Sequence, residues 1–374
     1  MTINDTYRPK VLFLMHLPPP VHGAAMAGNY IKNSNRINNK IDGTYINLAT
    51  NKELNLSGKG NFKKIVTFFA IIKNVLLTLK KCNYQLCHMS LTASGPGFYK
   101  DLVLVYLLKR RKTKIIYHFH NKGVAAASQN RLNNWLYKYA FKDTWSILLS
   151  PHLYKDVSRY VSETNVFYCP YGIPISENDC SKKVEKQNKI CNFLFLSNMI
   201  EEKGVYILLD AIKKLKNDKV NFHCHFVGGW SDITPIKFDN YLKLNNISDV
   251  ASAHGPKYNK EKESFYLKSD VFIFPTFYHY ETFGIVNLEA MQHCLPIIST
   301  PEGGIPDIVV NEKTGFLVPK KDSQQLAERM KLLADRPDIR KEMGIAGKQR
   351  FEELFTIEKF EERLSDILIK ACEK

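Results

Sequence analysis

The sequence has no long hydrophobic run and no targeting segment that we can identify. The longest apolar stretch, residues 65–79, is interrupted by Lys73 and cannot span a bilayer. Arg8 and Lys10 precede an apolar run at the amino terminus, but that run ends at Met15 and is too short for a secretion signal. We therefore expect a cytoplasmic protein that at most rests on the inner face of the cytoplasmic membrane.

The sequence also lacks the motifs of disulfide frameworks and of nicotinamide-dependent enzymes. Eight cysteines are scattered along the chain with no C-x-x-C pair, so we expect reduced and mostly buried thiols. Residues 23–28 follow the first predicted strand and lack the G-x-G-x-x-G pattern of NAD binding. This argues against a nicotinamide-dependent oxidoreductase.

Acidic residues are scarce in the first half of the chain. Residues 1–180 contain 24 Lys+Arg and 9 Asp+Glu, a net charge of +15, whereas residues 181–374 contain 29 and 28, a net charge of +1. A strongly basic half attracts nucleic acid, acidic lipid or an acidic substrate. No DNA- or RNA-binding motif accompanies the charge. We therefore expect an anionic membrane surface or a lipid-linked substrate as partner, and no nucleic acid; a plain solubilising surface is the alternative.

Short apolar runs alternate with longer amphipathic ones along the whole chain, which predicts parallel sheets covered by helices. The fold class is therefore α/β, with two doubly wound domains. The predicted strands are 11–15, 84–88, 115–119, 145–149, 193–196, 222–227, 271–274 and 296–298. The predicted helices include 62–81, 130–141, 205–215 and 323–333.

The chain length of 374 residues also fits two domains. A polar segment with almost no apolar residues precedes the first strand of the second half, which is typical of a linker. We predict a first domain at 1–178, a linker at 179–189 and a second domain at 190–350. Residues 351–374 have helical periodicity and many charges, which predicts a last helix.

The most informative segment, residues 274–291, contains two glutamates eight positions apart, Glu281 and Glu289. The spacing alone has little weight, because two other glutamate pairs in the chain share it. Its context is more informative: a predicted buried strand ends at Pro275, a loop follows, and a helix begins near Phe283.

This loop has the features of an anion-binding site. Ligands of doubly wound sheets bind at the carboxyl ends of the strands, where helix amino termini point. The backbone N–H groups of Phe283, Gly284 and Ile285, at the start of the predicted helix, predict an anion site, and Gly284 lets a phosphate approach the backbone. Glu281 and Glu289 would flank that site, which suits a nucleotide sugar with hydroxyl groups at both ends of its diphosphate.

The segment resembles family 4 of the retaining glycosyltransferases, which have the GT-B fold and a Glu-x7-Glu motif. The likeness continues in residues 196–204, which end in Lys203-Gly204, in the double-glycine turn of residues 296–307 and in residues 314–318. The chain is similar to the group 1 glycosyltransferases of bacterial surface polysaccharide synthesis. The resemblance implies two Rossmann-like domains facing across a cleft, with acceptor bound by the first and donor by the second. The last helix would cross back to the first domain.

The resemblance implies a role for each matched residue. Lys203 would contact the donor diphosphate, Glu281 the hydroxyl groups of the transferred sugar, and Glu289 the ribose. This suits the chemistry, because a departing nucleotide diphosphate develops negative charge that a lysine and backbone N–H groups stabilise. We expect recognition of the base near Gly255. Members of this fold generally need no bound metal, and the chain has no Asp-x-Asp triplet, so we expect neither metal nor cofactor.

Two positions depart from the family pattern. The family usually has arginine five positions before the lysine, where this chain has Asn198, so another cation contributes or the donor lies differently. Tyr171 stands where the family commonly has asparagine. In the first domain, Gly23 and Ala24 match the family's glycine-containing loop, which could close over the diphosphate. His120 matches the family's histidine near the reacting sugar.

We therefore predict a metal-independent, hexosyl-type glycosyltransferase with Glu281, His120 and Lys203 as catalytic residues. It would move a sugar, with retention, from a nucleotide diphosphate sugar to a glycan or polyprenyl-diphosphate-linked acceptor in capsule, O-antigen, lipopolysaccharide or exopolysaccharide assembly. No side chain is an evident nucleophile, which favours substrate positioning over a covalent intermediate. Two alternatives stay open: a nucleotide-sugar epimerase, and a non-catalytic sugar- or lipid-binding protein.

Overall fold

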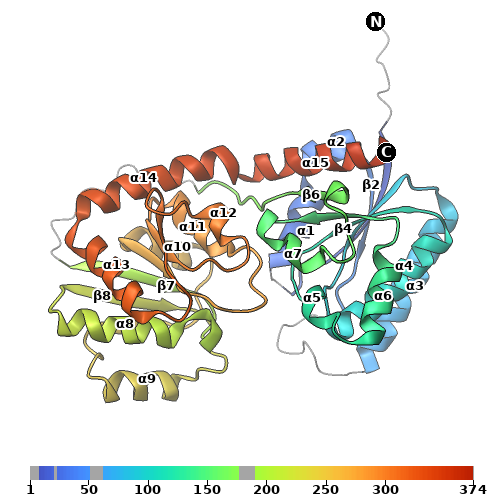
Figure 1. Cartoon of the computed structure of the whole chain (residues 1–374). Coiled ribbons are helices and arrows are strands. Elements are labelled where there is room, and N and C mark those ends of the chain that lie inside the picture. Colours follow the sequence, from blue (N-terminus) through green and yellow to red (C-terminus); the bar gives the residue numbers. More distant parts are fainter. Residues whose placement is uncertain (1–7, 21–22, 51–61, 177–189, 374) are drawn as a thin grey trace, which may run out of the picture. The chain divides into compact units, whose positions relative to one another are not determined.

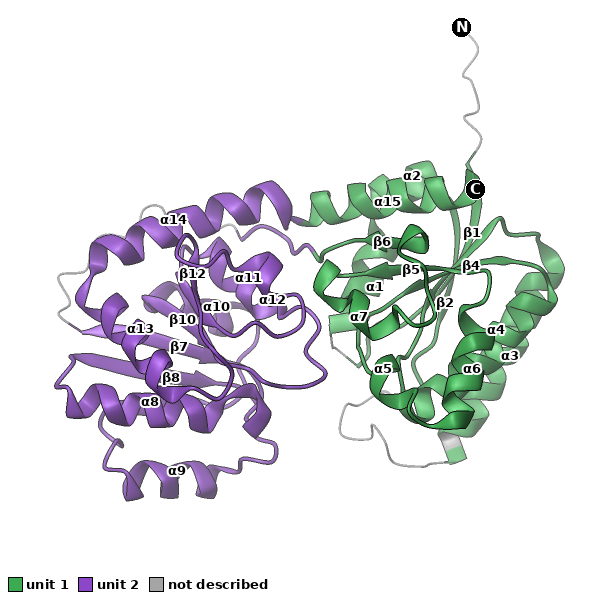
Figure 2. Cartoon of the chain, in the orientation of Figure 1, with its two compact units in different colours: residues 1–171, 357–374 green, residues 172–356 purple. Residues whose placement is uncertain are grey.

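Two compact units make up the chain (Figure 2). Unit 1 comprises residues 1–171 and 357–374, and unit 2 comprises residues 172–356. The division falls at Tyr171, before the predicted end of the first domain at residue 178. The predicted linker, 179–189, lies outside the described residues. This computed structural model describes residues 8–20, 23–50, 62–176 and 190–373.

Unit 1 is built on a parallel sheet of six strands in the order β2-β1-β3-β4-β5-β6 (Figure 1). Its four inner strands are buried almost throughout, as is typical of a sheet covered on both faces. The strands are β1 (Lys10–Met15), β2 (Asp42–Asn47), β3 (Leu86–Ser90), β4 (Lys114–His118), β5 (Trp145–Leu148) and β6 (Val166–Tyr168).

Polar side chains set the starts of several helices in unit 1. Ser34 accepts a hydrogen bond from the backbone N–H of Ile37, and Asn130 accepts two at the start of α6. The last helix, α15, packs against α2 and β3. The helices are α1 (Gly23–Asn33), α2 (Asn35–Lys40), α3 (Phe62–Lys81), α4 (Gly95–Arg110), α5 (Val124–Ala127), α6 (Arg131–Phe141), α7 (Tyr154–Val157) and α15 (Ile357–Glu373).

Unit 2 has a second parallel sheet of six strands, in the order β12-β11-β10-β7-β8-β9. The chain adds strands on one side of β7 and then, from β10 onward, on the other. The carboxyl ends of β7 and β10 therefore border the switch point where doubly wound sheets bind ligands. The strands are β7 (Cys191–Leu196), β8 (Phe222–Val227), β9 (Ala251–Ala253), β10 (Val271–Phe274), β11 (Ile297–Ser299) and β12 (Gly315–Leu317).

The helices of unit 2 pack in pairs, α8 with α13 and α11 with α14. The predicted boundary at residue 351 falls inside α14, and α15 begins after a short break at Ile357. None of the helices in the described part of the chain is long and apolar enough to cross a membrane. The helices are α8 (Val205–Asn217), α9 (Pro235–Leu244), α10 (Asn259–Lys268), α11 (Ile285–Gln292), α12 (Ile305–Ile308), α13 (Ser323–Asp335) and α14 (Pro337–Leu354).

The predicted fold class, two doubly wound α/β domains, is confirmed. Helix α3 and strands β8 and β10 have the predicted bounds. The sequence pattern does not predict β2, β6, β9 and β12, which form the edges of the two sheets. Edge strands are only partly buried and need no continuous apolar run, so their periodic signal is weak.

Most cysteines in the described part of the chain are free thiols. Burial raises the pKa of the Cys169 thiol to about 12, so that thiol stays protonated at neutral pH. Cys294 is disulfide-bonded, so the expectation of reduced thiols is wrong at that position. The free cysteines in the described residues are Cys82, Cys87, Cys169, Cys191, Cys224 and Cys372.

Phe195 lies at the centre of the unit 2 core. It is fully buried on β7, and its ring centroid is 5.5 Å from that of Phe226 on β8 and 6.5 Å from that of Phe274 on β10. The three rings hold together the strands that border the switch point.

We expect Phe195→Ala to lower the free energy of unfolding of unit 2 by about 3–5 kcal/mol, because it leaves a cavity between these strands. Leu244→Ala, at a position 83% exposed on α9, is the control and should change that free energy by less than about 0.5 kcal/mol. Urea denaturation of the full chain measures both. Similar losses in the two variants would contradict the assigned core.

Two histidines lie in the core of unit 1. His88 on β3 and His118 on β4 are fully buried, with ring nitrogens 3.1 Å apart. Burial lowers the pKa of His88 to about 4. Burial, with the neighbouring His120 and His88, lowers the pKa of His118 well below its usual value. Both imidazoles are therefore neutral in the folded protein at neutral pH.

Unit 1 should lose stability as the pH falls from about 6.5 toward 4. Histidine in the unfolded chain is protonated near pH 6.5, whereas folded His88 resists protonation down to about pH 4, so the unfolded state binds more protons in this window. His88 should contribute at most about 2 kcal/mol of this loss between pH 7 and pH 5. Urea titrations at both pH values measure it, and His88→Leu should reduce the pH dependence.

The matched control for this pH dependence is His152→Leu, which removes an exposed histidine of the same unit and should leave the dependence unchanged. If the pH dependence survives intact in His88→Leu, buried neutral histidine is not its cause.

Candidate functional site

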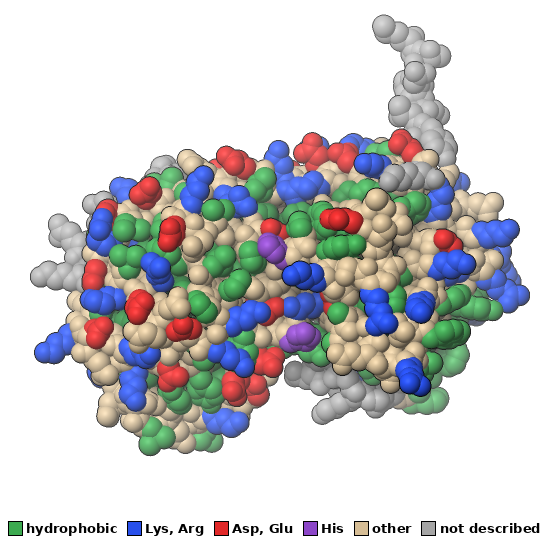
Figure 3. Space-filling model, in the orientation of Figure 1, with side chains coloured by type: hydrophobic (Ala, Val, Ile, Leu, Met, Phe, Trp, Pro, Cys, Tyr) green, Lys and Arg blue, Asp and Glu red, His purple; other side chains and the backbone are tan. Residues whose placement is uncertain are grey.

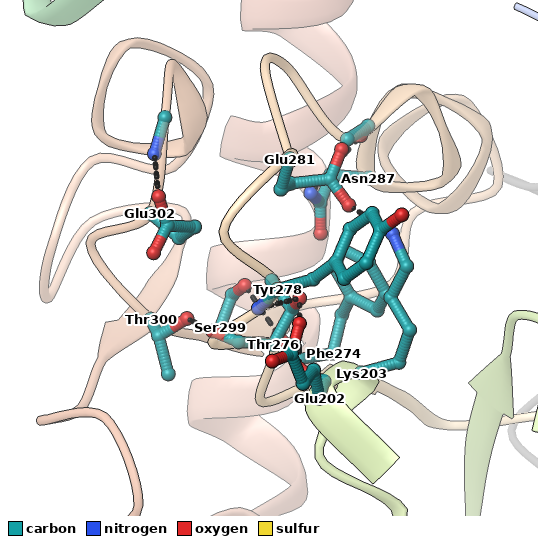
Figure 4. Close-up of polar contacts among 12 residues, drawn as sticks. Glu202, Lys203, Phe274, Thr276, Tyr278, Glu281, Asn287, Ser299, Thr300 and Glu302 are labelled. Atoms are coloured by element: carbon teal, nitrogen blue, oxygen red, sulfur yellow. Dashed lines mark hydrogen bonds and ion pairs between the residues drawn. The ribbon is translucent and has the colours of Figure 1, made fainter. Parts of the chain in front are cut away.

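Two loops of unit 2 meet at the switch point of its sheet. One loop, residues 197–204, follows β7, and the other, residues 275–284, follows β10. The two strands are parallel hydrogen-bonded neighbours, with Val271 paired to Phe193, so both loops leave the same edge of the sheet. Figure 4 shows the side chains that they bring together.

Lys203 is positioned by a tight turn that only glycine permits. It ends the short 3-10 turn η5 (Glu201–Lys203), and Gly204 then adopts φ +88° at the start of α8. A Cβ at Gly204 would lie 2.2 Å from the carbonyl oxygen of Pro275. The Lys-Gly pair therefore allows the turn after β7 to pack directly on the loop after β10.

The Lys203 ammonium and the Glu281 carboxylate form an ion pair, with Nζ 2.5 Å from Oε2. The same Nζ lies 4.4 Å from the ring centroid of Tyr278 and 5.4 Å from that of Phe274 (Figure 4). The two charged side chains are only 15% and 12% exposed. Residues 78 positions apart in the sequence thus form one partly buried polar centre.

Backbone hydrogen bonds fasten the loop of Glu281 from both sides. Phe277 N–H donates to the carbonyl of Glu202 at 2.8 Å, and Gly304 N–H donates to the carbonyl of Thr282 at 2.7 Å. Gly303 has φ +55°, and a Cβ there would lie 2.5 Å from the carbonyl oxygen of Glu281. The double-glycine turn after β11 therefore supports the loop that carries the carboxylate.

Helix α11 starts near the predicted position. It begins at Ile285, two residues after Phe283, and Gly284 with φ +75° precedes it. Phe283 is buried and packs on Phe355, so its side chain belongs to the core. Asn287 donates to the carbonyl of Gly284 at 3.0 Å and steadies this helix start.

Glu289 lies on α11, one turn beyond its start, and its carboxylate is held by two side chains of α10. Oε1 accepts a hydrogen bond from Lys262 Nζ at 2.7 Å, and Oε2 accepts one from the Tyr266 hydroxyl at 2.8 Å. Burial beside this carboxylate raises the pKa of Tyr266, so its hydroxyl stays protonated and donates. The sequence reasoning missed Lys262 and Tyr266, because no motif links them to Glu289.

The remaining predicted donor-binding residues of unit 2 lie in turns after β7 and β9. Asn198 is exposed directly after β7, and its carbonyl accepts a hydrogen bond from Ile200 N–H at 2.8 Å. Gly255 has φ +68°, with open space where a Cβ would stand. Its carbonyl accepts a hydrogen bond from Gly228 N–H at 3.0 Å, which joins the turns after β8 and β9.

The predicted residues of unit 1 also lie beyond strand ends. Gly23 and Ala24 form the first turn of α1, which follows β1. His120 follows β4, its Nε2 lies 3.2 Å from Ser90 Oγ, and its Nδ1 is hydrogen-bonded to the Tyr171 hydroxyl. Burial raises the pKa of Tyr171, so this hydroxyl stays protonated and donates to Nδ1. His120 is thereby held in one orientation.

Three histidines of unit 2, His223, His225 and His254, form a hydrogen-bonded network with Ser252. His225 Nδ1 is 3.0 Å from His254 Nε2, and Ser252 Oγ is 2.9 Å from His223 Nε2 and 3.1 Å from His254 Nε2. Over the described ranges, no group of three or more His, Cys, Asp and Glu side chains is arranged to hold a metal ion.

The chain is similar to known glycosyltransferases. The family model "Glycosyl transferases group 1" matches residues 176–350, a little under half of the chain. The capsular polysaccharide biosynthesis glycosyltransferase CapM of Staphylococcus aureus is 31% identical over 182 residues, which are 48% of this chain and 47% of CapM. The similar stretch thus spans about half the length of this relative.

Two solved structures resemble the whole chain. A glycosyltransferase from Rickettsia africae superimposes with a TM-score of 0.72 at 17% sequence identity. The superposition covers 97% of this chain and 98% of the Rickettsia chain. The Anabaena protein HepE in complex with UDP superimposes with a TM-score of 0.72 at 15% sequence identity. The superposition covers 97% of this chain and 100% of the HepE chain. The fold is therefore GT-B, and the sequence of residues 176–350 is similar to the group 1 glycosyl transferases.

Proposed function

We propose that the chain is a retaining glycosyltransferase of family 4, which transfers a hexose-type sugar from a nucleotide diphosphate sugar to a glycan or lipid-linked glycan. The observation that carries this proposal is the Lys203–Glu281 ion pair at the switch point of unit 2. The group 1 match over the same unit, the capsular relative CapM and the UDP complex of HepE support it. Assembly of a surface polysaccharide is the process that fits the capsular relative CapM.

Lys203 would bind the diphosphate of the donor. A diphosphate carries more negative charge than one carboxylate, so it competes with Glu281 for the ammonium. As the sugar–oxygen bond breaks, the charge on the leaving diphosphate increases, and a fixed cation stabilises that charge more than it stabilises the bound donor. The N–H groups at the start of α11, beside Gly284, would add to this stabilisation.

Glu281 would accept hydrogen bonds from hydroxyl groups of the transferred sugar, and Glu289 from those of the ribose. Lys262 and Tyr266 would orient the Glu289 carboxylate. Gly255 would lie beside the base. Asn198 would contact the donor without a charge, so Lys203 would be the main side-chain cation for the diphosphate.

The transfer would proceed by positioning and leaving-group stabilisation, without a metal and without a covalent enzyme intermediate. In unit 1, Tyr171 would hold His120 through Nδ1, and Nε2 would exchange its contact with Ser90 for one with the reacting sugar. The glycine-containing loop at Gly23 and Ala24 would contribute backbone N–H groups to the diphosphate.

We expect Lys203→Ala to lower kcat for donor turnover by about 10²–10³-fold, because it removes a charge that acts on the leaving group. Glu281→Gln keeps the size of the side chain and should also lower kcat, since an amide accepts sugar hydroxyl groups less strongly than a carboxylate. The kcat of each variant is measured as the slow release of nucleotide from the donor in the absence of acceptor.

Lys243→Ala, an exposed lysine on α9, is the matched control for this assay and should keep wild-type turnover. If Lys203→Ala turned the donor over as fast as this control, the proposed site would be wrong. If the wild type bound donor but released no nucleotide from it even with acceptors present, a non-catalytic sugar-binding protein would be the better description.

A panel of UDP-, GDP- and ADP-sugars, tested with EDTA present, should identify the donor by thermal stabilisation. One donor at 100 times its Kd should add about 2.7 kcal/mol to the free energy of unfolding, whereas NAD should add nothing. Conversion of that donor into its epimer would favour the epimerase alternative instead. An anomeric product of inverted configuration would contradict retention.

A further inference from the structure

Three neighbouring helices of unit 1 carry large apolar side chains that the core does not use. Helix α4 packs against α3 on one side and α6 on the other, and the three lie together at the right-hand edge of Figure 1. We refer to their outer surface as the three-helix face. Its exposed apolar residues are Phe62, Ile65, Val66, Phe69 and Leu77 on α3, Tyr99, Val103 and Tyr106 on α4, and Leu132 and Trp135 on α6.

Helix α3 is apolar on two sides. Its buried stripe contains Ile71, Val75 and Leu79 at intervals of four residues, and this stripe is what packing on the sheet requires. The opposite stripe includes Phe69, which is 63% exposed. A soluble helix is normally polar on its outer side, and contiguous exposed apolar surface marks a binding site.

The exposed charges on the three helices themselves have one sign. Helices α3 and α6 contain no acidic residue, and the one acid on α4, Asp101, is fully buried. Figure 3 shows hydrophobic and basic side chains side by side at this edge of the molecule. Among the described side chains, the exposed cations on or directly after these helices are Lys73, Lys80, Lys81, Arg110, Arg111, Lys112, Arg131, Lys138 and Lys142, and one exposed acid, Asp143, follows α6.

We infer that the three-helix face binds the surface of a bilayer that contains anionic lipids. Apolar side chains such as Phe69 and Trp135 would enter the boundary between head groups and acyl chains, and the lysines and arginines around them would contact the anionic head groups. Each kind of side chain strengthens binding by its own physical effect, so apolar and charge-removing substitutions should weaken it separately.

Other partners fit this face less well. In a symmetric dimer of the chain the same surface would meet itself, which would bring its cations together with no exposed acid on these helices to balance them. Nucleic acid is bound mainly through contacts to phosphates, and these do not use exposed Phe, Ile and Val side chains. An anionic bilayer matches both the apolar and the basic side chains.

The test is sedimentation of the full chain with vesicles of phosphatidylcholine and phosphatidylglycerol, compared with phosphatidylcholine alone. The double variant Phe69→Ser/Trp135→Ser should lower the partition coefficient on anionic vesicles at least ~10-fold, because it removes two aromatic side chains from the bilayer boundary. The matched control is Ile236→Ser/Leu244→Ser on α9 of unit 2, where the two positions are 73% and 83% exposed.

A second variant tests the charge. Lys73→Gln/Lys80→Gln/Lys81→Gln should weaken binding to anionic vesicles by at least ~10-fold and reduce its dependence on salt. The inference is overturned if the wild type does not bind anionic vesicles, if the Phe69/Trp135 variant binds as tightly as the wild type, or if the α9 control loses as much. Binding of RNA in place of vesicles would also overturn it. No donor is needed, so this result is independent of the proposed transferase activity.

Discussion

The contact between the Lys203 ammonium and the Glu281 carboxylate is the interaction on which the rest of the candidate site depends. It requires β7 and β10 to be neighbours, because the two residues belong to the loops after these strands. It also requires Gly204 and Gly303, since a side chain at either position would collide with the backbone of the loop that carries the glutamate. The strand order and the glycine turns thus serve one partly buried ion pair.

The two units carry different kinds of surface. The basic half of the chain forms most of unit 1, where the exposed apolar and basic side chains of α3, α4 and α6 gather. The half with balanced charge forms most of unit 2, where the ion pair and the carboxylate of Glu289 lie. The surface that we propose for anionic lipid and the site that we propose for a nucleotide sugar are therefore built from separate parts of the chain.

Sequence reasoning went wrong where the local signal was weak. The edge strands were not predicted, because partial burial leaves them without a continuous apolar run. The disulfide at Cys294 could not be foreseen, because a disulfide depends on which cysteines the fold brings together.

The sequence by itself determined the α/β class, the inner strands, helix α3 and the Lys-Gly and Glu-x7-Glu segments, because periodicity and short motifs are local properties of the chain. Only the tertiary structure decided that Lys203 meets Glu281 and that Lys262 and Tyr266 hold Glu289. It also decided that the apolar side chains of α3 form two stripes, one buried and one exposed. These are contacts between distant segments, and they exist only once the strand order has been set by folding.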